Sequence, residues 1–291
     1  MQINLLLIVA SIQLNLGCST TNKPIEKEPS VKFYVDPATN SDDMEIRMAY
    51  GLNIVPPWPD GGSIFVNLPE HLAYLPETKG IARHHDKRKN VWQAKADSTE
   101  AFYDVVSLSE PDVFMTVKAK SINQRATFEF TLTNRTHKTF KSLIPMFCFQ
   151  YKTLKGFPER LTNNFAHTYI VIDGKLALVA DLPVQDSSAV ARGAQVKDCT
   201  EEHNWWTMKM GGFISQRIDE AVTILTASND DRKVVLHWTP GKAFLSNSFI
   251  PCIHADACMG DLPPLDSKTI KGELIFTRAP LDQILKQLSS L

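Results

Sequence analysis

One segment of the sequence, residues 126–133, alternates strictly between two kinds of side chain. In an extended chain its apolar residues point to one side, while its threonines and its glutamate point to the other. The apolar set is Phe128, Phe130 and Leu132, and the polar set is Thr127, Glu129, Thr131 and Thr133. This period of two predicts a strand with one face in a core and one face in solvent. A strand of this kind must pair with others, so the segment commits the chain to a sheet.

Further strand-like runs follow along the chain, and clusters of turn residues separate them. Residues 169–172 and 176–180 flank Asp173-Gly174, a dipeptide that favours a tight hairpin turn. The remaining runs are residues 63–68, 113–120, 140–149, 221–227, 234–238 and 269–277. Helical spacing of apolar residues is seen clearly in residues 280–288, which begin with a proline. The pattern predicts an all-β fold, a large antiparallel β-sandwich with a short C-terminal helix.

Two segments resemble parts of the galactose mutarotase-like supersandwich. Residues 128–140 read as a strand ending in Thr-Asn, then a polar turn, then an apolar residue. Residues 262–276 place a proline-rich turn before an alternating strand. The resemblance implies a supersandwich-like fold, shared by aldose epimerases and by domains of many polysaccharide-active enzymes. It is architectural and assigns no catalytic residue, because the catalytic His and Glu motifs of that family are not matched here residue by residue.

The first 30 residues differ in character from the rest. Residues 3–16 are mostly apolar, too few to span a bilayer but typical of the hydrophobic part of a signal peptide. Gly17-Cys18 after them resembles a bacterial lipobox, whose cysteine carries the lipid. Residues 19–30 are polar, contain two prolines and predict a flexible tether. We therefore expect a signal peptide over residues 1–18, a tether over 19–30 and a β-sandwich domain over 31–291.

This leader predicts an exported lipoprotein that is anchored in the membrane through Cys18 and faces the periplasm or the cell surface. Plain secretion is the alternative, because Asn15 stands where a lipobox prefers leucine and no cation precedes Lys23.

The charge of the chain restricts its partners. There are 31 Lys and Arg residues against 32 Asp and Glu residues, for a net charge of -1. Binding to nucleic acid needs clustered excess cations, so we expect no nucleic-acid partner. The sequence also has no phosphate-binding loop and no dinucleotide glycine pattern, and it predicts no cofactor.

Four cysteines remain beyond Cys18. An even number in an exported chain favours disulfides, and four cysteines allow three pairings among which the sequence does not choose. The spacing of Cys252 and Cys258 would allow these two to pair and close a small loop. The alternative is a metal site, because His254 and Asp256 lie between the two thiols. This spacing matches no established zinc motif, so we predict no metal. Cys148, in an apolar run, is expected to be a buried apolar residue.

Several polar residues are candidates for proton transfer. They are His84, His85, Asp86, His167, His254 and Asp256. A histidine beside a carboxylate can act as a general base on a hydroxyl group. The alternative is that the first three lie in a solvated turn and that the others are structural.

Three tryptophans fall in predicted loops and are candidates for ligand binding. They are Trp58, Trp205 and Trp206. Aromatic faces stack on the C–H faces of sugars, and binding residues gather in loops. The alternative is that these side chains cover the core.

Together these features favour a cell-envelope protein that binds or modifies carbohydrate. A structural or assembly lipoprotein that docks a protein partner is the alternative from another class. A metal-dependent hydrolase that uses the histidines is the third hypothesis. The sequence leaves open whether any reaction is catalysed.

Overall fold

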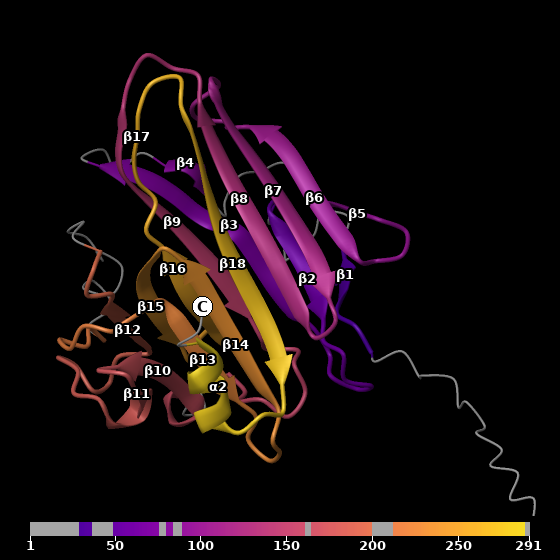
Figure 1. Cartoon of the computed structure of the whole chain (residues 1–291), viewed down its shortest axis with the longest axis vertical. Helices are drawn as coiled ribbons and strands as arrows, with labels where there is room; N and C mark the ends of the chain where they lie inside the picture. The colour runs from indigo at the N-terminus through magenta and orange to yellow at the C-terminus, as the bar shows by residue number, and fades with distance from the viewer. Residues whose placement is uncertain are drawn as a thin grey trace, which may run out of the picture.

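The protein folds into two large antiparallel β-sheets packed face to face (Figure 1). This is a computed structural model, and it describes residues 29–36, 49–75, 80–83, 89–160, 164–199 and 212–288. The all-β antiparallel sandwich with a short C-terminal helix, predicted from the sequence, is confirmed. The leader with Cys18 lies outside the described residues. Among the described residues, no helix is both long enough and apolar enough to cross a membrane.

Nine strands make up the first sheet, called sheet A. Its order is β1 (Lys32–Tyr34), β2 (Gly51–Val55), β3 (Ile64–Leu75), β9 (Phe140–Gln150), β16 (Cys252–Ala257), β15 (Gly241–Asn247) and β12 (Ala191–Gln195). Two short strands complete it, β4 (Gly80–Arg83) beside β3 and β17 (Gly260–Leu262) beside β9.

The second sheet, called sheet B, also has nine strands. Its order is β11 (Lys175–Leu178), β10 (Thr168–Ile172), β13 (Val222–Thr226), β14 (Lys233–Thr239), β18 (Ser267–Thr277), β8 (Arg125–Asn134), β7 (Val113–Ile122), β6 (Glu100–Val106) and β5 (Gln93–Ala94). Two 3-10 turns, η1 (Asn164–His167) and η2 (Val179–Asp181), lie near β10 and β11.

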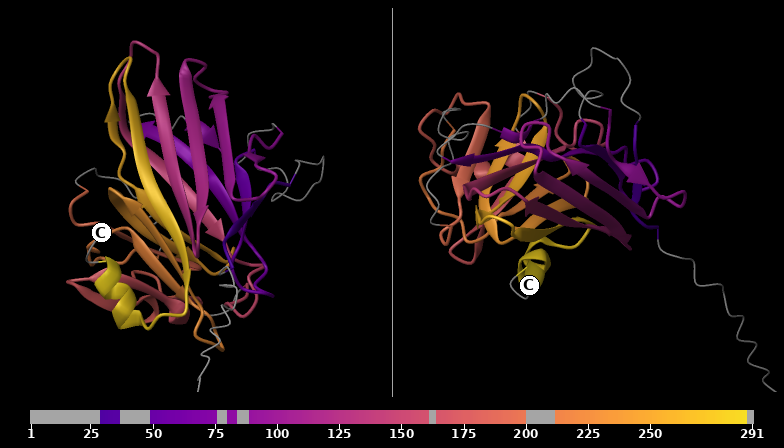
Figure 2. Two further views of the ribbon diagram at one scale, coloured as in Figure 1. Left: turned by 45° about the vertical axis from the view of Figure 1, so that its right-hand side comes forward. Right: turned by 90° about the horizontal axis from the view of Figure 1, so that it is seen from above.

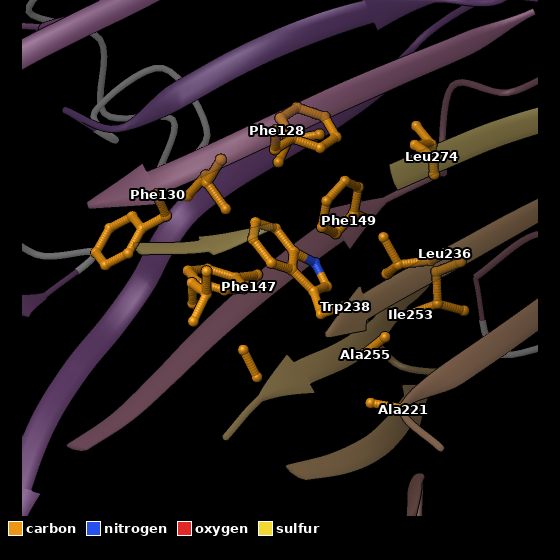
Figure 3. Close-up of a cluster of buried hydrophobic side chains, with 14 of the residues drawn as sticks. Phe128, Phe130, Phe147, Phe149, Ala221, Leu236, Trp238, Ile253, Ala255 and Leu274 are labelled. Carbon is orange, nitrogen blue, oxygen red and sulfur yellow. The ribbon is translucent and has the colours of Figure 1, made fainter. Parts of the chain in front are cut away.

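The core lies between the facing sides of the two sheets (Figure 3). Phe128 and Phe130 of β8 point inward from sheet B, as the alternation of the segment predicts. They meet Phe147 and Phe149 of β9 in sheet A, with ring centroids 5.5 Å apart for Phe130 and Phe147. Trp238 of β14 packs 4.3 Å from the ring of Phe147. Because this face of each sheet is buried, the other face is left for ligands or further packing.

Two of the predicted turns form as their residues require. Asp173 and Gly174 both have positive φ, 51° and 70°, which is the backbone of a two-residue hairpin turn between β10 and β11. At the end of β8, the buried amide of Asn134 donates to the carbonyls of Lys138 and Pro263, each at 2.8 Å. The amide thereby joins the turn after β8 to the proline-rich turn before β18.

The C-terminal helix, α2 (Leu281–Leu288), covers part of the outer face of sheet B (Figure 2). Ile284 and Leu288 pack against Val222, Ile224 and Val235 of β13 and β14. These side chains point away from the main core, so the helix closes one end of this face. The part of the face formed by β6, β7, β8 and β18 stays open.

Candidate functional site

The open part of the outer face of sheet B forms a broad groove with a volume of about 1000 Å³. Side chains from β6, β7, β8, β18 and β14 form its floor. We call it the sheet B groove. Along each of these strands, groove residues alternate with core residues, because successive side chains of a strand point to opposite faces of the sheet.

The register of the strands arranges the groove residues in rows that run across the sheet. One row contains Phe102, Lys118, Glu129, Lys271 and Thr239, each opposite the next on the neighbouring strand. The row beside it contains Glu100, Lys120, Thr127, Glu273 and His237. Acidic and basic side chains are therefore interleaved with hydroxyl groups and one aromatic ring.

Side chains of the groove also contact one another across strands. Lys271 Nζ lies 3.2 Å from Glu129 Oε1, and the hydroxyl of Thr116 donates to Asp104 over 3.2 Å. Phe102 is an apolar side chain in a row of charged and polar groups, and its ring is 42% exposed. An exposed ring beside side chains that form hydrogen bonds can hold a ligand that is both apolar and hydroxylated.

His237 is a buried side chain of the groove, at 8% exposed. Burial lowers the pKa of this imidazole, although Glu220 and Glu273 oppose the shift. The ring is therefore neutral at pH 7, with Nε2 3.0 Å from Thr239 Oγ1 and 3.8 Å from Glu220 Oε2. A neutral imidazole can both donate and accept a hydrogen bond.

A second polar group, on the outer face of sheet A, is buried. Cys252, His254 and Asp256 occupy alternate positions of β16 and therefore share one face of this strand. Cys148 of β9 and Glu70 of β3 join them. We call these five residues the sheet A cluster. His254 Nε2 lies 3.6 Å from Cys252 Sγ and 3.9 Å from Glu70 Oε2, and Nδ1 lies 3.5 Å from Asp256 Oδ1.

The cluster shifts the titration of its members. Contact with Cys252 and burial raise the pKa of the Cys148 thiol well above its usual range. Burial also raises the pKa of Glu70, while the nearby His254 partly opposes this. Burial alone would lower the pKa of His254, but Cys148 and Asp256 outweigh it and raise the pKa well above 6.5. The protonation states of the cluster are therefore interdependent.

Buried polar atoms without a hydrogen-bond partner gather in the same region. Among the described residues, they include both side-chain polar atoms of Asn67 and the amide oxygen of Gln150. Asn67 is opposite Cys148, and Gln150 is opposite Cys252, in the strand register. Unpaired buried polar groups are rare, and they often mark a bound water, an ion or a functional site.

The predicted pairing of Cys252 with Cys258 is wrong. Cys258 forms a disulfide with Cys199, and Cys252 is a buried free thiol. The physical reason is that β16 (Cys252–Ala257) is extended, which puts its two ends about 17 Å apart, and Cys258 follows its far end, beyond the reach of a disulfide from Cys252. The spacing suggested a small loop, whereas the segment is a strand.

Trp58 belongs neither to the sheet B groove nor to the sheet A cluster. Its ring stacks on Phe157 at 5.9 Å and meets the edge of Phe276 at 5.3 Å, with the guanidinium of Arg232 5.3 Å from its centroid. These contacts cover the end of the core. Trp205 and Trp206 lie outside the described residues.

The histidines do not gather at one place in the described structure. His167 lines a pocket of about 370 Å³ with Pro158 and Ser228, and its Nδ1 lies 3.5 Å from Thr226 Oγ1. His254 belongs to the sheet A cluster instead. His84, His85 and Asp86 lie outside the described residues.

Sequence reasoning missed Phe102, His237, Glu70 and the role of Cys148 as a neighbour of Cys252. The outward positions of residues 126–133 were the one available signal for the groove. The neighbours of that strand depend on the pairing of strands that are distant in sequence.

No known protein family matches the chain, and no curated protein matches its sequence. A galactose mutarotase-like protein from Clostridium acetobutylicum has a similar structure, with 11% identity and a TM-score of 0.44 over 86% of this chain and 99% of that one. A putative aldose 1-epimerase from Escherichia coli K12 has 9% identity and a TM-score of 0.41 over 84% of this chain and 99% of that one. A polysaccharide lyase has 10% identity and a TM-score of 0.41 over 86% of this chain and 33% of that one. Likeness at this level concerns the course of the chain alone, and it assigns no substrate and no residue role.

Proposed function

We propose that this protein binds carbohydrate in the sheet B groove. The observation that carries the proposal is the exposed ring of Phe102 in a row with Lys118 and Glu129. Sugars present apolar C–H faces together with many hydroxyl groups. A ring beside ammonium, carboxylate and hydroxyl groups matches both of these features.

The size of the groove fits an extended ligand. Its volume of about 1000 Å³ is at the upper end of the usual range for ligand sites. Five adjacent strands, from β6 to β14, contribute side chains, and they span about 19 Å at the normal spacing of strands. An oligosaccharide would follow the rows across the sheet.

The charge of the groove favours a neutral ligand. Its acidic residues are Glu100, Asp104, Glu129 and Glu273, and its basic residues are Lys118, Lys120 and Lys271. Because the two signs are interleaved and nearly cancel, the groove has no strong potential to attract a polyanion. Paired charges still offer donors and acceptors to hydroxyl groups.

The proposal places the groove at the cell envelope. The apolar leader, Gly17-Cys18 and the polar tether support export and a lipid anchor on Cys18. The wild type is expected in the membrane fraction and a Cys18→Ala variant in the soluble fraction. Mass spectrometry is expected to find a lipid on Cys18 of the wild type and no lipid on the variant. An unmodified Cys18 in the wild type would remove the anchor from the proposal and leave the groove untouched.

Binding can be tested with a glycan array followed by calorimetry on the best ligand. We expect Phe102→Ala to weaken binding by about tenfold or more, equivalent to about 1.4 kcal/mol. Phe249→Ala is the matched control, because Phe249 is 45% exposed and lies in the turn before β16, away from the groove. The Phe249→Ala variant should bind the same glycan with the affinity of the wild type.

The proposal would be overturned by a wild-type protein that binds no glycan, or by equal losses in the two variants. Crosslinking in intact cells addresses the alternative function. A stoichiometric protein partner, found together with no affinity for sugars, would favour an assembly lipoprotein over a carbohydrate-binding one.

A further inference from the structure

The sheet A cluster brings together three side chains that bind metals. The Sγ atoms of Cys148 and Cys252 and a ring nitrogen of His254 all lie within 4.8 Å of one another. All three residues are buried, on the adjacent strands β9 and β16. Neither of these thiols is in a disulfide.

We propose that Cys148, Cys252 and His254 bind a zinc ion, with the carboxylate of Glu70 at the fourth position. Two thiolates and an imidazole form a set that selects zinc among the common divalent ions, since calcium and magnesium require oxygen ligands. This site lies on the opposite sheet from the groove and is independent of carbohydrate binding.

The distances fit tetrahedral coordination. With Zn–S at about 2.3 Å and Zn–N at about 2.0 Å, a sulfur and a nitrogen ligand lie about 3.5 Å apart. Cys252 Sγ and His254 Nε2 are 3.6 Å apart. Glu70 Oε2 lies 3.9 Å from the same nitrogen, so a small movement of this side chain would complete the site.

The second nitrogen of His254 lies beside a carboxylate. Nδ1 is 3.5 Å from Asp256 Oδ1 without a hydrogen bond between them, and Nε2 is directed at the thiol of Cys252. Asp256 is itself held by the backbone N–H of Phe147, which donates to Oδ1 at 3.1 Å. A small movement of either side chain would turn this contact into the hydrogen bond by which a carboxylate behind a ligating histidine fixes the tautomer of the ring and strengthens its bond to the metal.

A metal also explains why so many polar groups are buried together. Glu70 and Asp256 lie 3.9 and 3.5 Å from His254, whose ring contacts Cys252, and the two carboxylate side chains are only 19% and 9% exposed. A divalent cation would compensate the negative charge of two thiolates and a carboxylate, which burial otherwise makes costly. A disulfide between Cys148 and Cys252 would leave Glu70, His254 and Asp256 without this compensation.

The test uses the full chain, purified without chelators. Elemental analysis is expected to find one zinc ion per chain, and exchange with cobalt is expected to give the near-ultraviolet absorption of a cobalt–thiolate bond. Cys148→Ser and Cys252→Ser are expected to lose the metal. Glu70→Gln is expected to keep zinc with at least tenfold lower affinity.

Histidine variants give a matched comparison. His254→Gln is expected to lose zinc, whereas His237→Gln, which changes a buried histidine of sheet B, is expected to keep one zinc per chain. Thiol reactivity tests the wild type without any substitution. Zinc should slow the reaction of Cys148 and Cys252 with a thiol reagent at least tenfold, and a chelator should restore the rate.

Three results would overturn the proposal. One is a wild-type protein that neither contains zinc nor binds added zinc. Another is a disulfide between Cys148 and Cys252 in freshly isolated protein. The third is equal loss of zinc in His254→Gln and His237→Gln. None of these results bears on the groove, whose affinity for glycans is measured separately.

Discussion

Gly272 lies directly opposite Trp238 on the neighbouring strands β18 and β14, and a Cβ atom at residue 272 would overlap the indole ring. The large ring fits into the core because its neighbour has no side chain. The packing of Phe147 and Phe128 against Trp238 therefore depends on a glycine in an adjacent strand.

We expect Gly272→Ala to destabilise the protein by about 1–3 kcal/mol, because the added methyl group must displace a packed ring. Urea unfolding followed by circular dichroism would measure this. In a Trp238→Leu background the same substitution should cost much less, since the ring that it meets is gone. An equal cost in both backgrounds would show that the contact is not the cause.

A second prediction concerns Asn134, whose side chain is fully buried at the end of β8. Its amide donates to two turns, and its Oδ1 accepts from the N–H of Thr136 at 2.9 Å. Asn134→Ala should lower the free energy of unfolding by about 2–3 kcal/mol, because these groups lose their partner. Asn123→Gly is the control, since Asn123 is exposed with a φ of 54° that glycine adopts readily. Comparable losses in the two variants would contradict this account.

The strands that could be predicted from the sequence are those with one face in the core. Residues 113–120, 126–133 and 269–277 alternate, and they correspond to β7, β8 and β18. In contrast, all six residues of β16 are buried, and five of the seven residues of β15 are buried. A strand covered on both faces has no alternation of apolar and polar side chains, so this pattern does not mark its sequence as a strand.

The site residues that could not be predicted lie on strands that are distant in the sequence. Cys252, His254 and Asp256 lie together in the sequence, but their neighbours Cys148 and Glu70 come from β9 and β3. The order β3-β9-β16 brings distant segments together, and no local pattern encodes it. For the groove, the outward side of β8 was predictable, while the row from Phe102 to Thr239 required the registers of four other strands.

A third prediction concerns the pH dependence of stability. Asp219 accepts hydrogen bonds from the backbone N–H groups of Asp173 and Gly174, at 3.1 and 2.7 Å, and from the ammonium of Lys197 at 2.6 Å. Partial burial would raise the pKa of Asp219, but these hydrogen bonds outweigh it and lower the pKa. The carboxylate thus holds the turn between β10 and β11.

Because the folded protein has the lower pKa, Asp219 stabilises it fully above the ordinary value of about 3.9. This stabilisation is lost as the pH falls through the lowered pKa of the folded state. Asp219→Asn should therefore be less stable than the wild type at pH 7, and the difference should shrink on acidification below about pH 4. Urea unfolding at a series of pH values measures it, and a difference that stays constant with pH would contradict the assignment.

The last prediction concerns the disulfide between Cys199 and Cys258, which are 59 residues apart. Peptide mapping without reduction should recover a linked pair of peptides that contains these two cysteines. A cross-link of this span restricts the unfolded chain, so the double variant Cys199→Ser/Cys258→Ser should lose about 2–4 kcal/mol of stability.

The single Cys258→Ser change also distinguishes the disulfide from the proposed zinc site, because it removes a disulfide partner but no proposed zinc ligand. Zinc content should therefore remain at one ion per chain in the folded variant. In the wild type, a peptide linking Cys252 to Cys258 would contradict both the disulfide between Cys199 and Cys258 and the free thiol of Cys252 beside His254.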